Sequence, residues 1–404
     1  MISPLCVVCK GTKHLCGKPN CELLDSIRAR TPKIEITGRE IIGSSPPSVF
    51  IGRYGYPKVK VGPMLPPDIV PMAGRLDSPE QWFGREIEDI IGLRASLFRT
   101  GKEIRVEEAS NPGRVLESYQ LVAMADRPVD TEVLLKKPIV SRRPELSFDM
   151  APLGPFEEAE KTELTENVHI PRRVEYITSD TDLRSADGAL DLYRNRISPY
   201  QIQKILSMGL LGRGNKRRMV PTRWSITATD DILGKAIISE IKAHETVDEY
   251  SVYTGNFAGN YFHILLIPRL WSYEMIETWL KGAFWTAQNT ILQDSEGYNG
   301  RKGYASNITG AYYAARLSVL EHLQRIRRQA TVVVYREITD EYWAPLGVWV
   351  IRETVREAMK TQPRRFDTLQ KAVRFISEGV RVKKWSESST LLREVRSQRT
   401  LFDF

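Results

Sequence analysis

The chain has 404 residues, of which 42% are hydrophobic and 27% are charged, and its formal net charge is +8 at pH 7. This composition excludes a disordered or fibrous protein, and the length predicts about two to three domains with enough chain to build a core without disulfides. No apolar run reaches the roughly 18 to 20 residues of a membrane helix, which excludes a spanning protein. The N-terminus shows no signal-peptide pattern, so we expect a cytoplasmic protein.

The positive charge is concentrated at the C-terminal end. Residues 301–404 contain 20 basic and 11 acidic residues, a net charge of +9, so the remainder of the chain sums to −1. Such a segment indicates a polyanion or an acidic protein surface as its partner, and a solvated, arginine-rich helical surface is the alternative.

All four cysteines lie within the first 25 residues, in the spacing C-x2-C-x6-C-x4-C. Two short loops of this kind can bring four thiolates around one tetrahedral ion, and a segment this short needs such an ion to fold. We predict a structural zinc module, with iron, an iron–sulfur cluster or unligated thiols as alternatives, and His14 could replace one thiolate. Four protein ligands leave no open position, so the ion would not be catalytic. The predicted ligands are Cys6, Cys9, Cys16 and Cys21.

Residues 34–71 are rich in glycine and proline, which predicts extended segments and tight loops. Within them, Arg53 is a cation among glycines and could form part of a cradle for a phosphate or a sugar. Tyr54 and Tyr56 would face one side of an extended backbone, which is also how core residues are arranged. Core packing is the more frequent reason for this arrangement, and base stacking is the alternative for these two rings.

Three further segments have readable patterns before residue 210. Ser78 and Pro79 suit the start of a helix. Residues 142–171 are acidic and proline-rich, and they predict an exposed linker or a long insertion. Helical periodicity follows over residues 186–209, with Pro199 starting a second helix.

The segment LLGRGNKRRMVPTRW combines glycines with a run of cations and an indole. Its cations could hold phosphates and its indole could stack on a base, so we predict contact with nucleic acid here. It is not a Walker A loop. An exposed basic loop and a mononucleotide site are the alternatives. The candidate residues are Arg213, Lys216, Arg217, Arg218, Arg223 and Trp224.

The rest of the chain mixes helices and strands without a regular β-α-β rhythm or a glycine-rich nucleotide fingerprint, so we predict an α+β fold with antiparallel strands. A hairpin is expected from two apolar segments joined near Phe257 and Ala258. The segment ATVVVYREI predicts another strand. Helices are expected over residues 230–244, 272–280, 309–328 and 346–360.

Catalytic candidates lie in QDSEGYNGRKGYASN, which we expect to be a loop. Asp294 and Glu296 could ligate a second divalent cation or share acid and base duties, while Arg301 would stabilise a developing phosphate charge. A solvated charged loop is the alternative. His263 alternates within an apolar strand, where a hydrogen-bonded histidine is the more frequent role than a ligand.

The last seven residues are QRTLFDF, after a polar stretch, WSESSTLLREVRS, that we expect to be poorly anchored. In one helical turn, Gln398, Leu401 and Phe404 would project toward one side. This pattern resembles the PCNA-interacting peptide, although its usual second aromatic would fall past the last residue unless Phe402 replaces it. A tail that docks on its own core is the alternative.

Several longer sequence segments along the chain resemble the archaeal Nre family of DNA repair proteins. They are GSSPPSVFIGRYGYPKVKVGP, VPTRWSITATDD, GRKGYASNITGAYYAARLSVLEHL and PLGVWVIRETVREA, together with the cysteines and the tail. The resemblance implies N- and C-terminal Nre regions, a role in the response to DNA damage, and binding of the PCNA sliding clamp through the tail. It implies no particular reaction. We therefore expect a zinc module at 1–25, Nre regions at 26–290 and 291–385, and a flexible tail at 386–404.

The prediction that follows is a DNA repair factor that the PCNA clamp recruits and that contacts DNA through basic surfaces. The alternative is a metal-dependent enzyme, such as a hydrolase, that acts on phosphodiesters or nucleotides.

Overall fold

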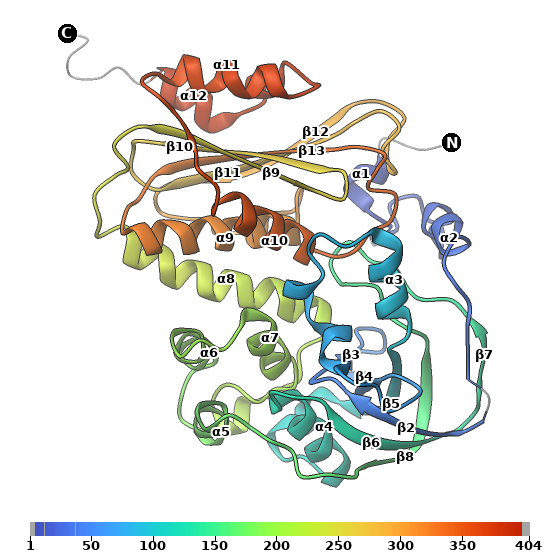
Figure 1. The fold of residues 1–404 in the computed structure, drawn as a ribbon. Coiled ribbons are helices and arrows are strands. Elements are labelled where there is room, and N and C mark those ends of the chain that lie inside the picture. The colour runs from blue at the N-terminus through green and yellow to red at the C-terminus, as the bar shows by residue number, and fades with distance from the viewer. Residues whose placement is uncertain (1–4, 12, 37, 398–404) are drawn as a thin grey trace. The chain divides into compact units, whose positions relative to one another are not determined.

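The computed structural model describes residues 5–11, 13–36 and 38–397 (Figure 1). Internal contacts divide the chain into two compact units, which are described separately below. Unit 2 spans Ser26–Leu233, and unit 1 combines the residues up to Asp25 with those from Gly234 onward. Helices α2 (Glu22–Arg28) and α8 (Thr222–Ile241) run across the boundaries between them.

Unit 2 is built on a six-stranded sheet in the order β2-β6-β8-β5-β4-β3, in which only β5 and β8 are parallel neighbours. Buried and less buried residues alternate along β6, which is typical of a sheet that packs one face on a core. Ile41, Leu65, Phe98 and Val133 belong to that core. The strands are β2 (Glu40–Ser45), β3 (Val49–Ile51), β4 (Lys58–Leu65), β5 (Phe98–Arg105), β6 (Val129–Leu135) and β8 (Phe156–Leu164), with β1 (Ile34–Ile36) and β7 (Ile139–Arg142) as a separate antiparallel pair.

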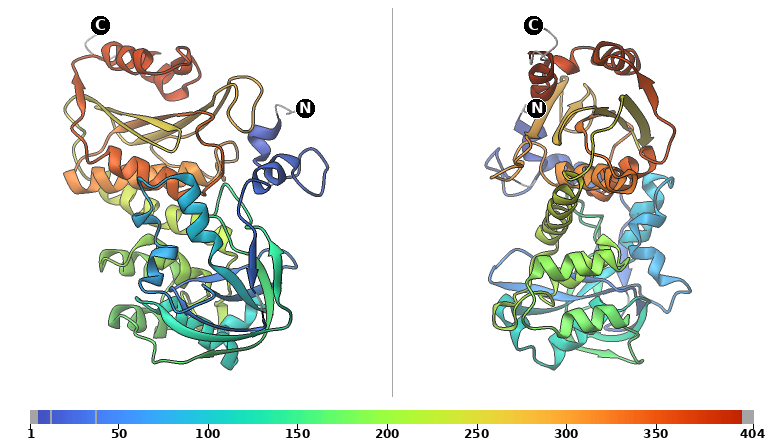
Figure 2. Two further views of the ribbon diagram at one scale, coloured as in Figure 1. Left: turned by 45° about the vertical axis from the view of Figure 1, so that its right-hand side comes forward. Right: turned by 90° about the vertical axis from the view of Figure 1, so that its left-hand side faces the viewer.

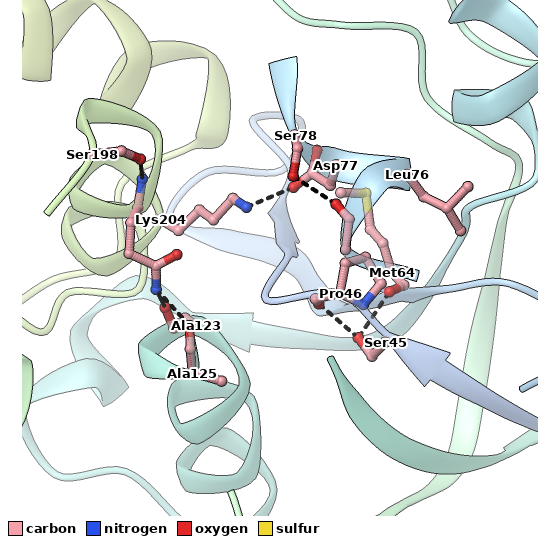
Figure 3. Close-up of polar contacts among 12 residues, drawn as sticks. Ser45, Pro46, Met64, Leu76, Asp77, Ser78, Ala123, Ala125, Ser198 and Lys204 are labelled. Atoms are coloured by element: carbon pink, nitrogen blue, oxygen red, sulfur yellow. Dashed lines mark hydrogen bonds and ion pairs between the residues drawn. The ribbon is translucent and has the colours of Figure 1, made fainter. Parts of the chain in front are cut away.

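The helices of unit 2 are held together by polar contacts that Figure 3 shows. Ser198 caps α7 by accepting a hydrogen bond from the backbone N–H of Gln201, and the Gln201 side chain donates to two carbonyls at the end of α4. The Lys204 ammonium lies 2.8 Å from the Asp77 carboxylate, which joins α7 to the 3₁₀ turn Ala73–Asp77. The helices are α3 (Ile87–Ala95), α4 (Arg114–Met124), α5 (Arg172–Ser179), α6 (Ser185–Arg194) and α7 (Pro199–Ser207), with 3₁₀ turns at Pro79–Gln81, Val106–Ser110 and Gly214–Lys216.

Unit 1 contains a second six-stranded sheet, in the order β12-β11-β13-β10-β9-β14, with β11 and β13 as its parallel neighbours. Helices α9 and α10 cover one face of this sheet, and α11 and α12 cover the other (Figures 1 and 2). Every residue of β13 is buried, as expected for a strand covered on both faces. The strands are β9 (Tyr250–Phe257), β10 (Asn260–Ile267), β11 (Ser272–Trp279), β12 (Thr290–Glu296), β13 (Thr331–Ile338) and β14 (Arg364–Phe366). The helices are α1 (Leu5–Cys9), α9 (Gly310–Ile326), α10 (Trp349–Ala358), α11 (Leu369–Gly379) and α12 (Thr390–Ser397), with a 3₁₀ turn at Trp385–Glu387.

These elements confirm the predicted α+β class. The hairpin of β9 and β10, the helix pair α6 and α7, and the helices α9 and α10 all occur where the sequence patterns predict them. Helix α8 overlaps the predicted 230–244 segment but begins earlier, at Thr222, and ends at Ile241. In the part of the chain that the structure describes, no helix is long and apolar enough to cross a bilayer.

Residues 272–280, predicted as a helix, form strand β11 instead. The strand pairs with β12 on one side and β13 on the other. Because both faces of the sheet are covered, nearly all its residues are buried, and the polar–apolar alternation that identifies a half-exposed strand is lost.

The acidic segment 142–171, predicted as a linker or an insertion, supplies β8 in the middle of the unit 2 sheet. Its acidic residues are compatible with a strand because basic residues from other strands and loops face them. Glu158 pairs with Lys136 at 2.6 Å, and Glu157 pairs with Arg142 at 3.0 Å.

The polar stretch after residue 384 is also more ordered than predicted. Trp385 and Ser389 are fully buried, and α12 packs Leu391 and Leu392 against the sheet of unit 1. The folded structure therefore continues to Ser397, and of the tail predicted at 386–404 only the last seven residues lie outside the described part.

Candidate nucleic-acid interface

Two segments that the sequence marks separately as phosphate candidates lie side by side in unit 2. The backbone N–H of Val106 donates to the Pro57 carbonyl, and the Val106 carbonyl accepts from the Met219 N–H, both at 2.9 Å. The Ile51 N–H donates to the Thr222 hydroxyl, also at 2.9 Å. Residues 51–57, which lead from β3 to β4, are therefore joined to residues 213–224 through the Val106 backbone and the Thr222 hydroxyl.

Large aromatic side chains are exposed where these two segments meet. Tyr54 is 76% exposed, Tyr56 is 48% exposed and Trp224 is 46% exposed. The Tyr56 and Trp224 ring centroids are 5.7 Å apart, and the Arg53 guanidinium lies 4.9 Å from the centre of the Tyr54 ring. We call Arg53, Tyr54, Tyr56 and Trp224 the aromatic surface. Neighbouring exposed rings of this size are typical of binding sites, because leaving them in water forgoes the stabilisation that burial would give.

Exposed cations occur on the segments that carry this surface. Arg213 and Lys216 are exposed on the basic loop. Arg218 is also exposed and approaches Glu107 only at 3.6 Å, while Lys58 approaches Glu103 at 3.5 Å. Ion pairs this long and this exposed leave cations that can still interact with phosphates.

Two other predicted phosphate contacts have internal partners instead. Arg217 donates to the carbonyls of Gly212, Thr178 and Asp180 at 2.7–2.8 Å, and thereby closes the C-terminal end of α5. Burial lowers the pKa of Arg217, although the nearby Asp180 carboxylate opposes that effect. Arg223 forms a largely buried ion pair with Asp149 at 2.6 Å. The phosphate role in this loop is therefore best suited to Arg213, Lys216 and Arg218.

The candidate carboxylates Asp294 and Glu296 lie on strand β12 in unit 1, and not in a loop. Asp294 accepts hydrogen bonds from the backbone N–H groups of residues 307 and 308 and pairs with Arg301 at 3.2 Å. Glu296 pairs with Arg316 at 2.7 Å, and both side chains of that pair are buried. Each carboxylate therefore already has a cationic partner that stabilises the fold, and the expected solvated loop begins only after Glu296.

His263 lies apart from these carboxylates. It is directly opposite Tyr335 in the register of β10 and β13, and Tyr335 packs under α11 and α12. Asp294 is opposite Met275 on β11, and the next residue, Ile276, packs on the α11 and α12 face. Because successive residues of a strand alternate between faces, Met275 and Asp294 point to the other face. His263 and Asp294 thus project from opposite faces of the sheet. Burial lowers the pKa of His263, against the raising effect of Glu337, so the ring is neutral at pH 7.

The four cysteines lie on and around α1, in unit 1. Cys6 and Cys9 are on the helix, Cys16 is in an exposed turn, and Cys21 directly precedes α2. None of them forms a disulfide. Positive φ angles of 68° at Gly11 and 73° at Gly17 let the backbone turn after a cysteine, a conformation that glycine adopts without strain.

The chemistry of these donors fits zinc. Burial alone would raise the pKa of the Cys9 thiol, but backbone N–H groups of residues 11 and 13–15 point at its sulfur and hold its pKa below the ordinary value. Such amides favour the thiolate, which is the form that binds metal. The sulfurs are not gathered, however: among described residues, no three His, Cys, Asp or Glu side chains are grouped closely enough to hold an ion.

Side chains beside the cysteines anchor this segment to the rest of unit 1. The buried Lys10 ammonium lies 3.1 Å from the Glu277 carboxylate on β11 and 3.3 Å from the Ile308 carbonyl. Lys13 donates to the Ser306 carbonyl at 2.8 Å. Sequence reasoning did not identify this contact, because Lys10 and Glu277 are 267 residues apart and neither belongs to a motif.

Comparisons with known proteins agree over nearly the whole chain. A model of the archaeal Nre N-terminal region matches residues 15–286, and a model of the C-terminal region matches residues 296–404. The chain belongs to the archaeal Nre family. DNA repair protein NreA of Archaeoglobus fulgidus is 40% identical over 386 residues, which cover 95% of this chain and 96% of that protein. DNA repair protein NreB of the same organism is 40% identical over 405 residues, or 99% of each chain.

DNA repair protein NreA of Haloferax volcanii is 36% identical over 408 residues, which cover 97% of this chain and 96% of that protein. No solved structure matches the chain significantly. The Nre N-terminal match includes the whole aromatic surface and the basic loop, whereas Cys6 and Cys9 precede it. That match also continues past Leu233, so the two Nre regions do not coincide with the two compact units.

Proposed function

We propose that this Nre-family protein acts in DNA repair and binds unpaired bases of DNA through the aromatic surface of unit 2. The repair role is supported by the names of its relatives, which are DNA repair proteins. The DNA contact is supported by one observation above the others: the exposed rings of Tyr56 and Trp224 lie 5.7 Å apart, on segments that also carry the exposed Tyr54 and exposed cations. Rings stack on bases of any sequence, and cations follow the phosphate backbone.

Unpaired bases suit this surface better than a regular duplex. In a duplex the faces of the bases are covered by their neighbours, so exposed rings have no partner to stack on. In single strands, and at flaps or lesions, those faces are available, and each stacking contact contributes about 1–3 kcal/mol. The cation–π contact of Arg53 with Tyr54 also presents a guanidinium beside the ring, where a phosphate would lie.

The test is the affinity of the full chain for a single-stranded oligonucleotide, measured by fluorescence anisotropy. Trp224→Ala and Tyr54→Ala should each weaken binding about 5- to 150-fold, the equivalent of one lost stacking contact. Tyr304→Ala is the matched control, because Tyr304 is 53% exposed but lies in unit 1. Equal losses in all three variants, or none, would overturn the assignment of this surface.

We propose that Gln398–Phe404 recruits the protein to the PCNA clamp. These residues lie outside the described part of the chain, so the proposal is supported by their pattern, in which Gln398, Leu401 and Phe404 recur at intervals of three. Deleting them should abolish capture by immobilised PCNA and leave the thermal unfolding curve unchanged. Capture that survives the deletion would refute the assignment.

We propose that the cysteine segment binds one structural zinc ion. The four-thiol donor set, the glycine turns and the amides around Cys9 support this site. Mass spectrometry of the native protein should find about one zinc per chain, and Cys6→Ser with Cys9→Ser should remove it. Lys18→Ala is a control, since this exposed residue changes no thiol. A metal-free native chain with the same unfolding temperature would overturn the proposal.

A further inference from the structure

Helix α12 is fixed to unit 1 by its N-terminal end. The buried Glu274 carboxylate on β11 accepts hydrogen bonds from the Ser389 hydroxyl and from the backbone N–H groups of Thr390 and Leu391, the last two at 2.8 and 3.3 Å. A carboxylate at a helix N-terminus satisfies free N–H groups and interacts favourably with the helix dipole. Leu391 and Leu392, in the first turn of the same helix, are buried. The helix is therefore part of the folded unit.

The proposed clamp peptide begins at the residue after this helix. Helix α12 ends at Ser397, and Gln398 is the first residue of the peptide. Consecutive Cα atoms are about 3.8 Å apart, and each extended residue adds at most about 3.6 Å. A protein that takes Gln398 into a pocket must therefore come within a few ångströms of the last turn of α12, because the sequence provides no spacer.

The exposed side of that last turn is basic. Arg393 and Arg396 are exposed, with Glu394 between them. The surrounding segment, residues 369–397, contains seven basic and three acidic residues. A protein surface held this close by the peptide would meet a net positive charge, which favours acidic side chains opposite it.

We propose that α12 is a second contact for the clamp, in which Arg393 and Arg396 pair with acidic side chains beside the groove that receives the peptide. This inference rests on the proposed recruitment by PCNA. It adds that the clamp is held against a folded face of unit 1, so that the ring and unit 1 have a defined relative orientation.

The experiment compares the full chain with a synthetic peptide of residues 398–404 in binding to purified PCNA by calorimetry. The full chain should bind about 2- to 30-fold more tightly than the peptide, the range for two exposed ion pairs. Arg393→Glu with Arg396→Glu should remove this difference. The matched control is Lys371→Glu with Arg374→Glu, which makes the same change of charge on exposed α11 side chains.

An insertion of eight Gly and Ser residues after Ser397 provides a second, independent measurement. It separates the peptide from α12 by roughly 16 Å on average and should lower the affinity to that of the peptide. Equal affinity of chain and peptide, or tighter binding after the insertion, would overturn the second contact while leaving recruitment intact. If neither chain nor peptide binds, the recruitment proposal fails, and the second contact fails with it.

Discussion

The two sheets of this protein place their charged residues in opposite ways. The unit 1 sheet is covered on both faces, and its carboxylates are buried: Glu277 holds Lys10, Glu274 caps α12, and Glu337 accepts the N–H groups of residues 381 and 382. In unit 2, β8 forms exposed ion pairs, such as that of Glu158 with Lys136. The buried carboxylates fix segments that are distant in sequence, such as Lys10 on Glu277, whereas the exposed pair of Glu158 with Lys136 joins residues only 22 positions apart.

This contrast predicts that the largest loss of stability will come from Glu277→Ala. The substitution leaves Lys10 and Arg336 buried without their carboxylate, and removing one partner of such a network costs about 3–5 kcal/mol. Chemical denaturation should show this loss. Asp367→Ala, which removes an exposed pair with Lys371, is the control and should change stability by less than 1 kcal/mol. Similar losses in both variants would remove the distinction between buried and exposed carboxylates.

A smaller effect should appear in the pH dependence of the free energy of unfolding, and it originates at Asp77 in unit 2. Burial alone would raise the pKa of Asp77, but the cations of Lys204 and Arg94 outweigh burial and hold its pKa below the ordinary value. A carboxyl with a lowered pKa stabilises the folded state above its unfolded pKa, near 3.9, and that contribution is lost as the pH falls further. The free energy of unfolding should therefore decrease below about pH 4.

Asp77→Asn should flatten this acid dependence, because the substituted side chain no longer titrates. Asp367→Asn is the comparison, since hydrogen bonding to Lys371 also lowers the pKa of Asp367 but this carboxylate is exposed to solvent. Its effect on the slope should be smaller because water screens the pair. A slope that is unchanged in Asp77→Asn would show that Asp77 is not the group responsible.

Within the basic loop, Arg217 and Arg218 should behave differently although they are neighbours. Arg217→Ala leaves three carbonyls without their donor and should cost about 1–3 kcal/mol of stability. Arg218→Ala should leave stability unchanged but weaken DNA binding. It should also reduce the slope of the logarithm of the binding constant against the logarithm of the salt concentration by about one. Thermal unfolding and salt-dependent anisotropy, measured on both variants, distinguish a structural cation from one that contacts DNA. A salt slope that Arg218→Ala leaves unchanged would exclude this residue from the DNA contact.

Sequence patterns predicted the elements that have one exposed face or a clear cap. Pro199 starts α7 as predicted, and the β9–β10 hairpin follows its apolar segments. The patterns failed for β11, where two covered faces remove the alternation, and for β8, whose acids are paired by basic residues outside the strand. For the candidate site, Arg53 and Trp224 were named from sequence, whereas Tyr54 and Tyr56 were expected to pack in the core and are exposed instead. The proximity of the two segments was not predicted, because it depends on Val106 bridging parts that are remote in the chain.

The smallest expected effect lies on strand β8 itself. Glu158 and Lys136 are each nearly half exposed, so the attraction between them is weakened by water and offset by the loss of side-chain freedom. A double-mutant cycle of Glu158→Ala and Lys136→Ala should therefore give a coupling energy of about 0.2–1 kcal/mol. The same cycle on the buried pair of Glu296 and Arg316 should give a much larger coupling, since neither side chain contacts water. The two pairs have nearly the same separation, 2.6 and 2.7 Å, and differ in burial. Equal coupling energies would therefore show that burial does not determine the strength of these ion pairs.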